Sequence, residues 1–289
     1  MLTKKQTYTL AYSPCPNDTY IFAALTNGML RDAPEVRVHL ADIEELNEAA
    51  ARAEYALTKV SYGAIPFLMR DYRLLRAGGA LGRGCGPLVV TRPGEISSLD
   101  ALKDKRIAIP GERTTAFMLL QLALGMRPAT VQMRFDRIIP AVANGEVDAG
   151  LIIHESRFTY PDAGLVSVAD LGEWWERATN MPIPLGGILV RNDVDDARAA
   201  EINDAIRTSL RFARERETRV MPYIREHAFE MNDDVMRKHI ELYVNGYSED
   251  LGDDGVAAIN ELFRRARDAD IIPSDTALRI ILRQAQDRS

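Results

Sequence analysis

The chain has 289 residues and a hydrophobic content of 46%, which suggests about two domains of roughly 100–200 residues, each with a full core. The formal net charge is −6 with acidic and basic residues well mixed, which argues against a surface for nucleic acid or anionic membranes but leaves room for a local basic pocket. No run approaches the ~18 apolar residues of a membrane helix, and no apolar run of signal-peptide length stands near the N-terminus, so we expect a cytoplasmic protein.

The first predicted elements are a strand, a rigid loop and a helix. Residues 7–12 alternate as a strand does, and residues 20–25 are apolar at helical spacing and precede an Asn-Gly helix stop. Between them stands the loop SPCPND, whose two prolines restrict the backbone and whose Asn17 or Asp18 we predict as the helix N-cap. A rigid loop leading into a helix N-terminus suits anion binding, although these residues fit a well-capped turn equally well.

Strands and helices then alternate as far as about residue 190. A strand at about 35–41 is followed by a helix, and a short strand then runs into a helix near Ser61. Two strands, at 72–79 and 86–92, stand on either side of a glycine-rich loop, and a buried strand at 106–109 precedes an apolar helix. Residues 131–158 contain a strand, a helix ending at Gly145 and a further strand. Such alternation is typical of α/β proteins with largely parallel sheets.

From about residue 193 the pattern changes to helices joined by polar segments. Asp193 and Asp195 fit the start of the first of these helices, and Ser274 fits the start of a later one. The C-terminal third is therefore predicted to be helical.

No segment rich in Gly, Ser or Pro marks a domain linker, so the plausible crossings between domains are residues 91–94 and 191–192. We therefore expect two α/β lobes, the first built from 1–92 plus 191–289 with the C-terminal helices, and the second from 93–190. Two lobes joined by two crossings form a cleft, and clefts between domains are where small ligands bind.

Three predicted strand-to-helix junctions could hold a ligand, at residues 13–19, 58–62 and 111–115. Each puts hydroxyl or amide side chains and free backbone N–H groups at a helix start. In open α/β sheets such junctions lie at the carboxyl ends of strands, where ligands bind. Each helix N-terminus favours negative charge by roughly 0.3–1 kcal/mol when exposed, so the expected ligand is a small acid or a phosphate.

Lys59 and Arg113 would add full positive charges at the second and third junctions. The alternative is that Ser61 and Thr114 are only helix N-caps and that both cations are solvated. One junction alone would favour that alternative, whereas three together favour ligand binding.

The apolar run 147–153 is followed by four polar residues, His154 to Arg157, at the carboxyl end of a predicted strand. His154 is one of only four histidines, and histidine is the side chain best suited to proton transfer near neutral pH. Glu155 or Arg157 could orient its ring or bind a carboxylate. The alternative is a structural histidine whose ring is hydrogen-bonded to the backbone.

Two further features have less specific interpretations. The segment 78–87 holds five glycines, but it has neither a P-loop nor a G-x-G-x-x-G pattern, so it is either a hinge-side loop or a backbone that approaches a ligand closely. Trp174 and Trp175 could form a stacking platform, although such a pair is more often one core residue and one half-exposed neighbour.

Metal binding and cysteine chemistry have little support. The histidines show no metal-ligand spacing, and no serine nucleophile elbow is present. With only Cys15 and Cys85, a disulfide scaffold is excluded, whereas a single bridge is not. Cys15 stands near a helix N-terminus, which lowers a thiol pKa, but no partner base is evident and a packing role is the better interpretation.

Six long segments are unusual enough to identify relatives: SPCPNDTYIFAAL, LTKVSYGAIP, GGALGRGCGPLVV, IPGERTTAF, GEVDAGLIIHESRFTY and DLGEWWERATNMPIPLGGILVRND. Together they resemble the 1,4-dihydroxy-6-naphthoate synthases of the futalosine route to menaquinone. The resemblance runs from about residue 8 to at least 195. It implies a two-lobed fold similar to type II periplasmic binding proteins. It also implies a lyase that converts cyclic dehypoxanthine futalosine to 1,4-dihydroxy-6-naphthoate without a cofactor or metal.

The resemblance also implies roles for particular residues. The family's general base falls on His154. Its substrate contacts fall on two of the three junctions, at Lys59, Val60, Ser61, Thr114 and Thr115. We add Asn17 and Arg157 as candidate substrate contacts from their expected places near the cleft. The expected partner is a small-molecule carboxylate substrate, with neither nucleic acid nor membrane, and a homodimer is compatible with the sequence.

Three alternatives have the same predicted fold. A non-catalytic receptor for a small acid would require export and would not need a histidine in the cleft. A chorismate dehydratase of the same pathway shares the fold, but we do not expect SPCPND or HESRFTY in it. An effector domain of a transcription factor would need a DNA-binding extension, and the sequence shows none.

Overall fold

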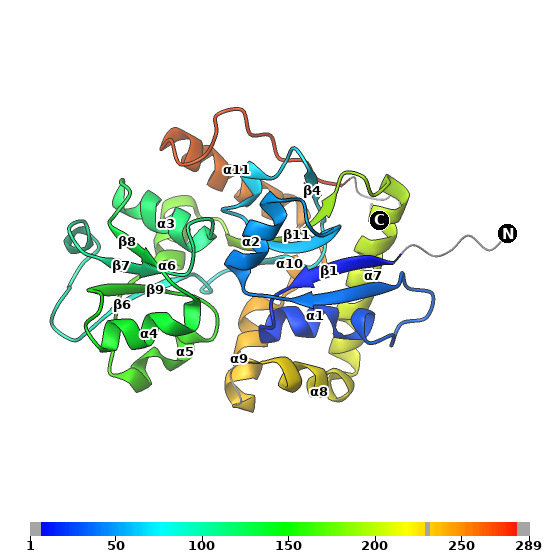
Figure 1. Cartoon of the computed structure of the whole chain (residues 1–289), viewed down its shortest axis with the longest axis horizontal. Coiled ribbons are helices and arrows are strands. Elements are labelled where there is room, and N and C mark those ends of the chain that lie inside the picture. The colour runs from blue at the N-terminus through cyan, green and yellow to red at the C-terminus, as the bar shows by residue number, and fades with distance from the viewer. Residues whose placement is uncertain (1–6, 229–231, 282–289) are drawn as a thin grey trace.

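The computed structural model describes residues 7–228 and 232–281 and contains two separate β-sheets with helices around them (Figure 1). The first sheet has the strand order β2-β1-β3-β11-β4, and β5 also pairs with β11. Its strands are β1 (Tyr8–Tyr12), β2 (Val36–Leu40), β3 (Leu57–Ser61), β4 (Tyr72–Leu74), β5 (Ala80–Gly82) and β11 (Ile183–Arg191). The second sheet has the order β10-β6-β9-β7-β8. Its strands are β6 (Leu88–Thr91), β7 (Ile107–Ile109), β8 (Thr130–Gln132), β9 (Ala149–Ile152) and β10 (Val166–Asp170). The α/β class is therefore as predicted.

Each sheet is mixed because one strand runs against all the others, so the prediction of largely parallel sheets holds for every strand except β11 and β6. In the first sheet β1 is parallel to β2 and β3, whereas β11 is antiparallel to β3, β4 and β5. In the second sheet β7 is parallel to β8 and β9, whereas β6 is antiparallel to β9 and β10. Strands β6 and β11 are each the first strand that the chain forms after it crosses from one sheet to the other. Periodicity in the sequence identifies a strand but does not give its direction.

The strands also show where the chain passes between the sheets. It leaves the first sheet after β5 and enters the second at β6, and it returns after β10 through helix α6 (Leu171–Thr179) into β11. Residues 88–91 therefore belong to the second sheet and residues 183–190 to the first, unlike in the predicted division at 92/93 and 190/191. We propose that the lobe boundaries lie within residues 83–87 and 171–182.

The remaining helices of the first two thirds of the chain start where predicted to within a few residues, except the short helix after β9, where no helix was predicted. They are α1 (Pro16–Thr26), α2 (Ile43–Ala51), α3 (Thr115–Leu124), α4 (Phe135–Ala143) and the short α5 (Ser156–Thr159), with 3-10 turns at Ile65–Phe67, Asp100–Leu102 and Tyr160–Ala163. The predicted helix after Ser61 is only such a turn. The predicted N-cap of α1 is also wrong. The helix begins at Pro16, because proline suits the first helical position, and Cys15 is the N-cap.

The C-terminal part is helical, as predicted. Its helices are α7 (Asp196–Glu215), α8 (Glu217–His227), α9 (Asp233–Tyr243), α10 (Gly246–Glu249) and α11 (Gly252–Asp268). Asp195 caps α7 by accepting a hydrogen bond from the Arg198 backbone N–H, 2.9 Å away. No helix begins at Ser274 within the described residues 269–281, where the chain forms a turn. None of the helices in the described part of the chain is long and apolar enough to cross a membrane.

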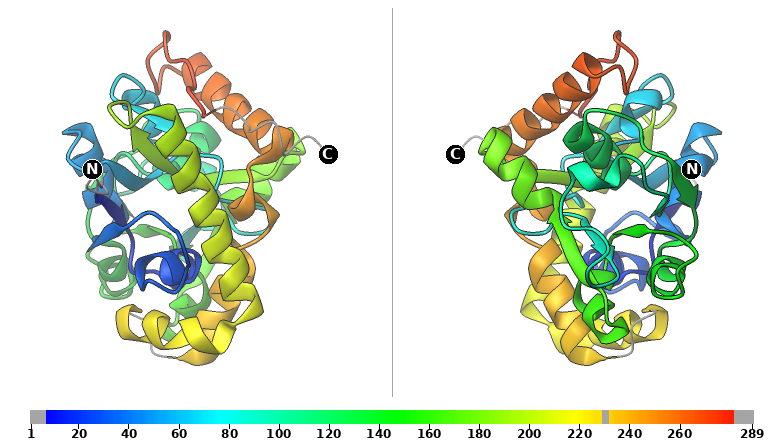
Figure 2. Two further views of the ribbon diagram at one scale, coloured as in Figure 1. Left: turned by 90° about the vertical axis from the view of Figure 1, so that its right-hand side faces the viewer. Right: turned by 90° about the vertical axis from the view of Figure 1, so that its left-hand side faces the viewer.

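These helices cover the first sheet and reach the second lobe. Helix α1 packs against α7, α8 and α9, and their shared core includes Phe22, Ile206 and Leu210. The long α7 crosses the face of the molecule that the left-hand view of Figure 2 turns toward the viewer. Helix α11 packs against both β11 of the first sheet and α3 of the second lobe. The C-terminal helices thus stabilise the arrangement of both lobes around the space between them.

Candidate active site between the lobes

A cavity lies where the two lobes meet, and it encloses about 620 Å³ of empty space, its open mouth included. Its wall contains six of the eight predicted site residues, which come from all three junctions and from the end of β9: Asn17, Lys59, Ser61, Thr114, Thr115 and His154. Residues far apart in the sequence therefore meet because the carboxyl ends of β1, β3, β7 and β9 face one cleft.

A buried ion pair forms one side of the cavity. The Lys59 Nζ atom lies 2.7 Å from Asp18 Oδ1, and the two side chains are only 4% and 3% exposed. Nζ also donates to the Gly78 carbonyl at 3.1 Å, so one of its three donors is left for a ligand. Lys59 is therefore not the solvated cation of the alternative interpretation, and Asp18 balances its charge.

Asn17 connects this ion pair to a histidine that the sequence analysis did not single out. Asn17 Nδ2 donates to Asp18 Oδ1 at 3.0 Å, and Asn17 Oδ1 lies 3.0 Å from Nε2 of His239 on α9. Ser13 Oγ also donates to Asp18 Oδ2, at 2.8 Å. The SPCPND loop is thus fixed by side-chain hydrogen bonds on the cavity side.

Ser61 ends β3 and is held by α2. Its backbone N–H donates to Asn47 Oδ1 at 2.9 Å, and its Oγ accepts from Asn47 Nδ2 at 3.3 Å. Among the described residues no acceptor receives the Ser61 hydroxyl proton, so this hydroxyl can donate to a ligand. Asn47 Nδ2 also donates to Glu44 Oε2 at 2.8 Å, and burial raises the pKa of the Glu44 carboxyl.

The two threonines of the third junction are already hydrogen-bonded inside the protein. Thr114 caps α3 by accepting from the Phe117 N–H, and its hydroxyl donates to the Gly111 carbonyl at 2.7 Å. The Thr115 hydroxyl accepts from Gly63 N at 3.0 Å and donates to Leu185 O at 2.6 Å. Both hydroxyls can therefore only accept hydrogen bonds from a ligand, and Thr115 joins the lobes.

His154 is half-buried and follows β9 in the left-handed backbone conformation, with φ of 57°. Residues with a side chain adopt this conformation at a cost, and such strain is concentrated at functional sites. Burial lowers the pKa of His154 to about 4, with the nearby Lys59 charge adding to the effect and Asp18 opposing it. The ring is therefore neutral near pH 7 and offers a lone pair as a base. It makes an edge contact with Phe135, with ring centroids 5.2 Å apart.

Two predicted substrate contacts are not brought to this cavity. The Val60 side chain packs in the hydrophobic core with Leu74, because side chains alternate along β3 and those of Lys59 and Ser61 use the face toward the cavity. Arg157 pairs with Asp170 at 2.7 Å and donates to the Gly86 carbonyl at 2.6 Å. It borders a separate surface depression instead.

Three other residues considered in the sequence analysis contact protein groups and do not line the cavity. The Arg113 guanidinium lies over the Phe67 ring, 4.4 Å from its centroid, and not on the cavity wall. Trp175 is a core residue whose Nε1 donates to Pro182 O at 3.0 Å, and Trp174 is half-buried, so the pair is no stacking platform in the cleft.

The cysteines and the glycine-rich loop border the site without supplying a nucleophile. Cys15 and Cys85 are both buried and unbridged. Burial raises the pKa of the Cys15 thiol well above its ordinary value and that of Cys85 to about 12, so neither forms a thiolate readily. The loop does approach the cavity, since Ala80, Cys85 and Pro87 line it. Within residues 7–228 and 232–281, no three His, Cys, Asp or Glu side chains are grouped so that they could hold a metal ion.

Comparison with known proteins adds relatives that extend over nearly the whole chain. A family described as "Menaquinone biosynthesis" matches residues 8–268. A Thermus thermophilus protein named 1,4-dihydroxy-6-naphthoate synthase is 48% identical over 258 residues, covering 89% of this chain and 93% of the relative. A Streptomyces coelicolor protein of the same name is 45% identical over 273 residues, covering 93% of this chain and 95% of the relative.

Similarity to solved structures identifies the fold. A protein of Archaeoglobus fulgidus superposes with a TM-score of 0.86 at 38% identity, covering 92% of this chain and 98% of the other. The alkanesulfonate-binding protein SsuA of Xanthomonas axonopodis superposes with a TM-score of 0.73 at 14% identity, covering 95% and 96%. A Candida albicans protein described as having the generic periplasmic-binding-protein fold gives a TM-score of 0.65 at 13% identity, covering 97% and 99%. The chain has this binding-protein fold, as predicted.

Proposed function

The chain belongs to the menaquinone biosynthesis family, together with the 1,4-dihydroxy-6-naphthoate synthases, and on that premise we propose that it is a carbon–carbon lyase. The proposed reaction converts cyclic dehypoxanthine futalosine to 1,4-dihydroxy-6-naphthoate and releases the sugar-derived fragment. The observation that supports it most is the neutral imidazole of His154 in the wall of the cavity between the lobes.

In the proposed mechanism His154 acts as general base. It takes the proton of a hydroxyl on the spirocyclic sugar portion, and the O–H electron pair forms a carbonyl as the adjacent C–C bond breaks. The electron pair of that bond enters the neighbouring ring, which becomes aromatic, and the imidazolium returns its proton to the product oxygen. Aromatisation supplies most of the driving force, and the protein supplies positioning and one base.

The other cavity residues hold the substrate in this proposal. The Ser61 hydroxyl and the remaining Lys59 donor are suited to a substrate carboxylate or carbonyl, since both can still donate. Thr114 and Thr115 can accept from substrate hydroxyls, and Asn17 borders the same space. The steps need neither a cofactor nor a metal. We propose the small-molecule carboxylate substrate as the binding partner, and a homodimer is a prediction that the structure of the single chain does not test.

Turnover by the purified protein tests the reaction. Incubation with cyclic dehypoxanthine futalosine should yield one equivalent of 1,4-dihydroxy-6-naphthoate, identified by mass, while a parallel incubation with chorismate should yield no dehydrated product. Product from chorismate alone would assign the dehydratase reaction of the same pathway. Binding of the futalosine compound without product would assign a non-catalytic small-acid-binding protein, the activity that the names of several structural relatives describe for those relatives.

A further inference from the structure

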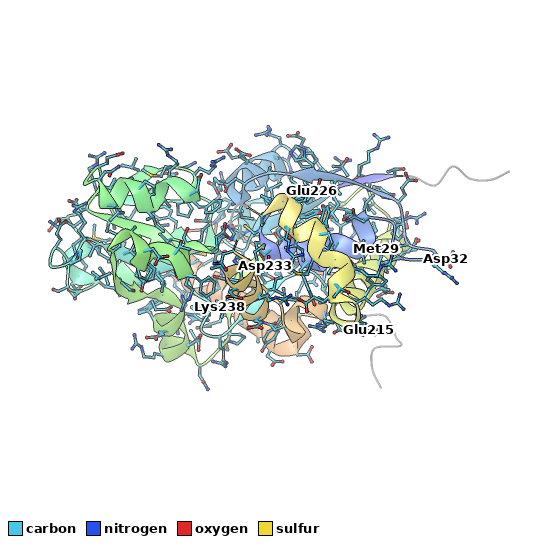
Figure 3. The ribbon with its side chains drawn as sticks, turned by 90° about the horizontal axis from the view of Figure 1, so that it is seen from below. Met29, Asp32, Glu215, Glu226, Asp233 and Lys238 are labelled. Atoms are coloured by element: carbon cyan, nitrogen blue, oxygen red, sulfur yellow. The ribbon has the colours of Figure 1, made fainter. Side chains whose placement is uncertain are left out.

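His239 lies in the wall of the cavity although it comes from the C-terminal helices. It is 222 residues from its hydrogen-bond partner Asn17, and its side chain is 1% exposed. Its neighbours on the same face of α9, Met236, Ile240 and Tyr243, are buried and mostly apolar, so a polar ring here has a desolvation cost unless its nitrogens are hydrogen-bonded. Figure 3 shows α9, with Lys238 labelled, at the boundary between the two lobes.

The hydrogen-bond network determines which ring nitrogen carries the proton. Asp18 is the acceptor for Lys59 and for Asn17, so the amide nitrogen of Asn17 faces Asp18. The amide oxygen of Asn17 then faces Nε2 of His239 at 3.0 Å and can only accept. His239 Nε2 therefore carries the hydrogen, and Nδ1 of the neutral ring is a bare acceptor. Burial and the adjacent His154 lower the pKa of His239 well below its ordinary value, which agrees with a neutral ring.

This Nδ1 atom is buried and receives no hydrogen bond from any described residue. Oε2 of Glu155 lies 3.8 Å from this Nδ1 atom, beyond hydrogen-bond distance. The ring of His154 is almost parallel to that of His239, at an angle of 18° and a centroid separation of 6.3 Å. Two neutral imidazoles thus border one small space, and one of them has a buried acceptor that the protein leaves without a donor.

We propose that His239 is a substrate-binding residue whose Nδ1 accepts a hydrogen bond from a hydroxyl of the ligand beside His154. This inference rests on the proposed function and deepens it, because it identifies the part of the cavity that takes the hydroxyl-bearing, sugar-derived portion of the substrate. A site built to pair a buried acceptor with a substrate hydroxyl discriminates strongly against ligands that lack it. The same cavity would therefore bind a plain aromatic acid without hydroxyls poorly.

Two substitutions separate this role from a merely structural one. In His239→Gln the amide group reaches the position of Nε2, so the hydrogen bond to Asn17 is kept and the Nδ1 acceptor is lost. In His239→Asn the amide oxygen takes the position of Nδ1, so the acceptor is kept and the bond to Asn17 is lost. His39→Asn is the matched control, since His39 is exposed on β2 and stacks on Tyr55.

Each variant is combined with His154→Ala, which should slow turnover by roughly 10²–10⁴, and is titrated with cyclic dehypoxanthine futalosine by calorimetry. We expect His239→Gln to raise Kd about 10–100-fold, from the loss of one buried hydrogen bond, and His239→Asn and His39→Asn to change it only a few-fold. On the active background the KM of His239→Gln should rise more than its kcat falls. In the His154→Ala protein with His239 intact, the ¹⁵N resonance of Nδ1 should shift when the substrate binds.

The opposite pattern, with His239→Gln like the parent and His239→Asn weakened, would show that His239 only holds Asn17 and would overturn the inference. Parent-like binding by both variants with an unmoved Nδ1 resonance would overturn it as well, because water alone would then satisfy Nδ1. If His239→Asn does not fold, the Kd of His239→Gln and the Nδ1 resonance decide. Absence of turnover by the parent enzyme would instead overturn the proposed function.

Discussion

Replacing Lys59 by Met should destabilise the protein because it leaves the Asp18 carboxylate buried without a cation. The two side chains are 4% and 3% exposed and their charged atoms are 2.7 Å apart. Methionine has a similar length, so the change removes the charge and keeps most of the packing. Asp18 retains hydrogen bonds from Ser13 and Asn17, at 2.8 and 3.0 Å.

Removing one partner of a buried ion pair lowers the free energy of unfolding by about 3–5 kcal/mol. The two remaining donors to Asp18 place our expectation at the lower end of that range. The loss should therefore be about 3 kcal/mol, which is a large fraction of the 5–15 kcal/mol typical of a domain.

Urea unfolding, followed by circular dichroism at pH 7.5, measures this loss. The control is Lys103→Met, which removes the lysine of an exposed pair with Asp100 and should leave the free energy of unfolding almost unchanged. Asp18→Asn combined with Lys59→Met removes both charges and should recover at least half of the loss. A Lys59→Met protein as stable as the Lys103→Met control would refute the reasoning.

Three further outcomes are expected. Gly111→Ala would put a Cβ atom 2.3 Å from Cδ of Glu44 in the other lobe, so urea unfolding should show that the free energy of unfolding falls by about 1–3 kcal/mol. The control Gly246→Ala, where a Cβ atom would meet nothing within 4 Å, should show a smaller loss. Equal losses in the two variants would contradict the crowding at Gly111. Because the neutral form of His154 is the base and its pKa is about 4, kcat/KM should stay constant from pH 8 to about 5 and fall by half near pH 4, and a midpoint near 6.5 would contradict the burial of the ring. Both cysteines should react with a thiol reagent slowly in the native protein and fast in denaturant, and a rapid native reaction of either would contradict its burial.

The junction residues could be predicted from the sequence because their signal is local. A strand, a polar turn and a helix follow one another within a few residues, and the carboxyl ends of strands face the cleft in this class of fold. Val60 shows the limit of the approach. Carried over together with its neighbours, it was predicted to contact substrate, yet the alternation of side chains along a strand already points Val60 away from Lys59 and Ser61.

His239 could not be placed from sequence reasoning because its hydrogen-bond partner Asn17 is 222 residues away. One signal was present: the residue occupies an apolar position of an amphipathic helix, three residues after Met236 and four before Tyr243. A histidine on an apolar face indicates burial, but it does not tell whether the ring faces a core or a cavity. The directions of β6 and β11 were missed for a similar reason, since they depend on how distant strands pair.

The measurement that tests the central claim most directly is the kcat of His154→Ala with cyclic dehypoxanthine futalosine, made together with the Kd of the same variant. His39→Ala serves as the control histidine, exposed and outside the cavity. The account predicts that kcat falls by roughly 10²–10⁴ while Kd stays within a few-fold of the parent KM and the control keeps its rate. A His154→Ala protein whose kcat stays within a few-fold of the parent would contradict the assignment of His154 as the general base.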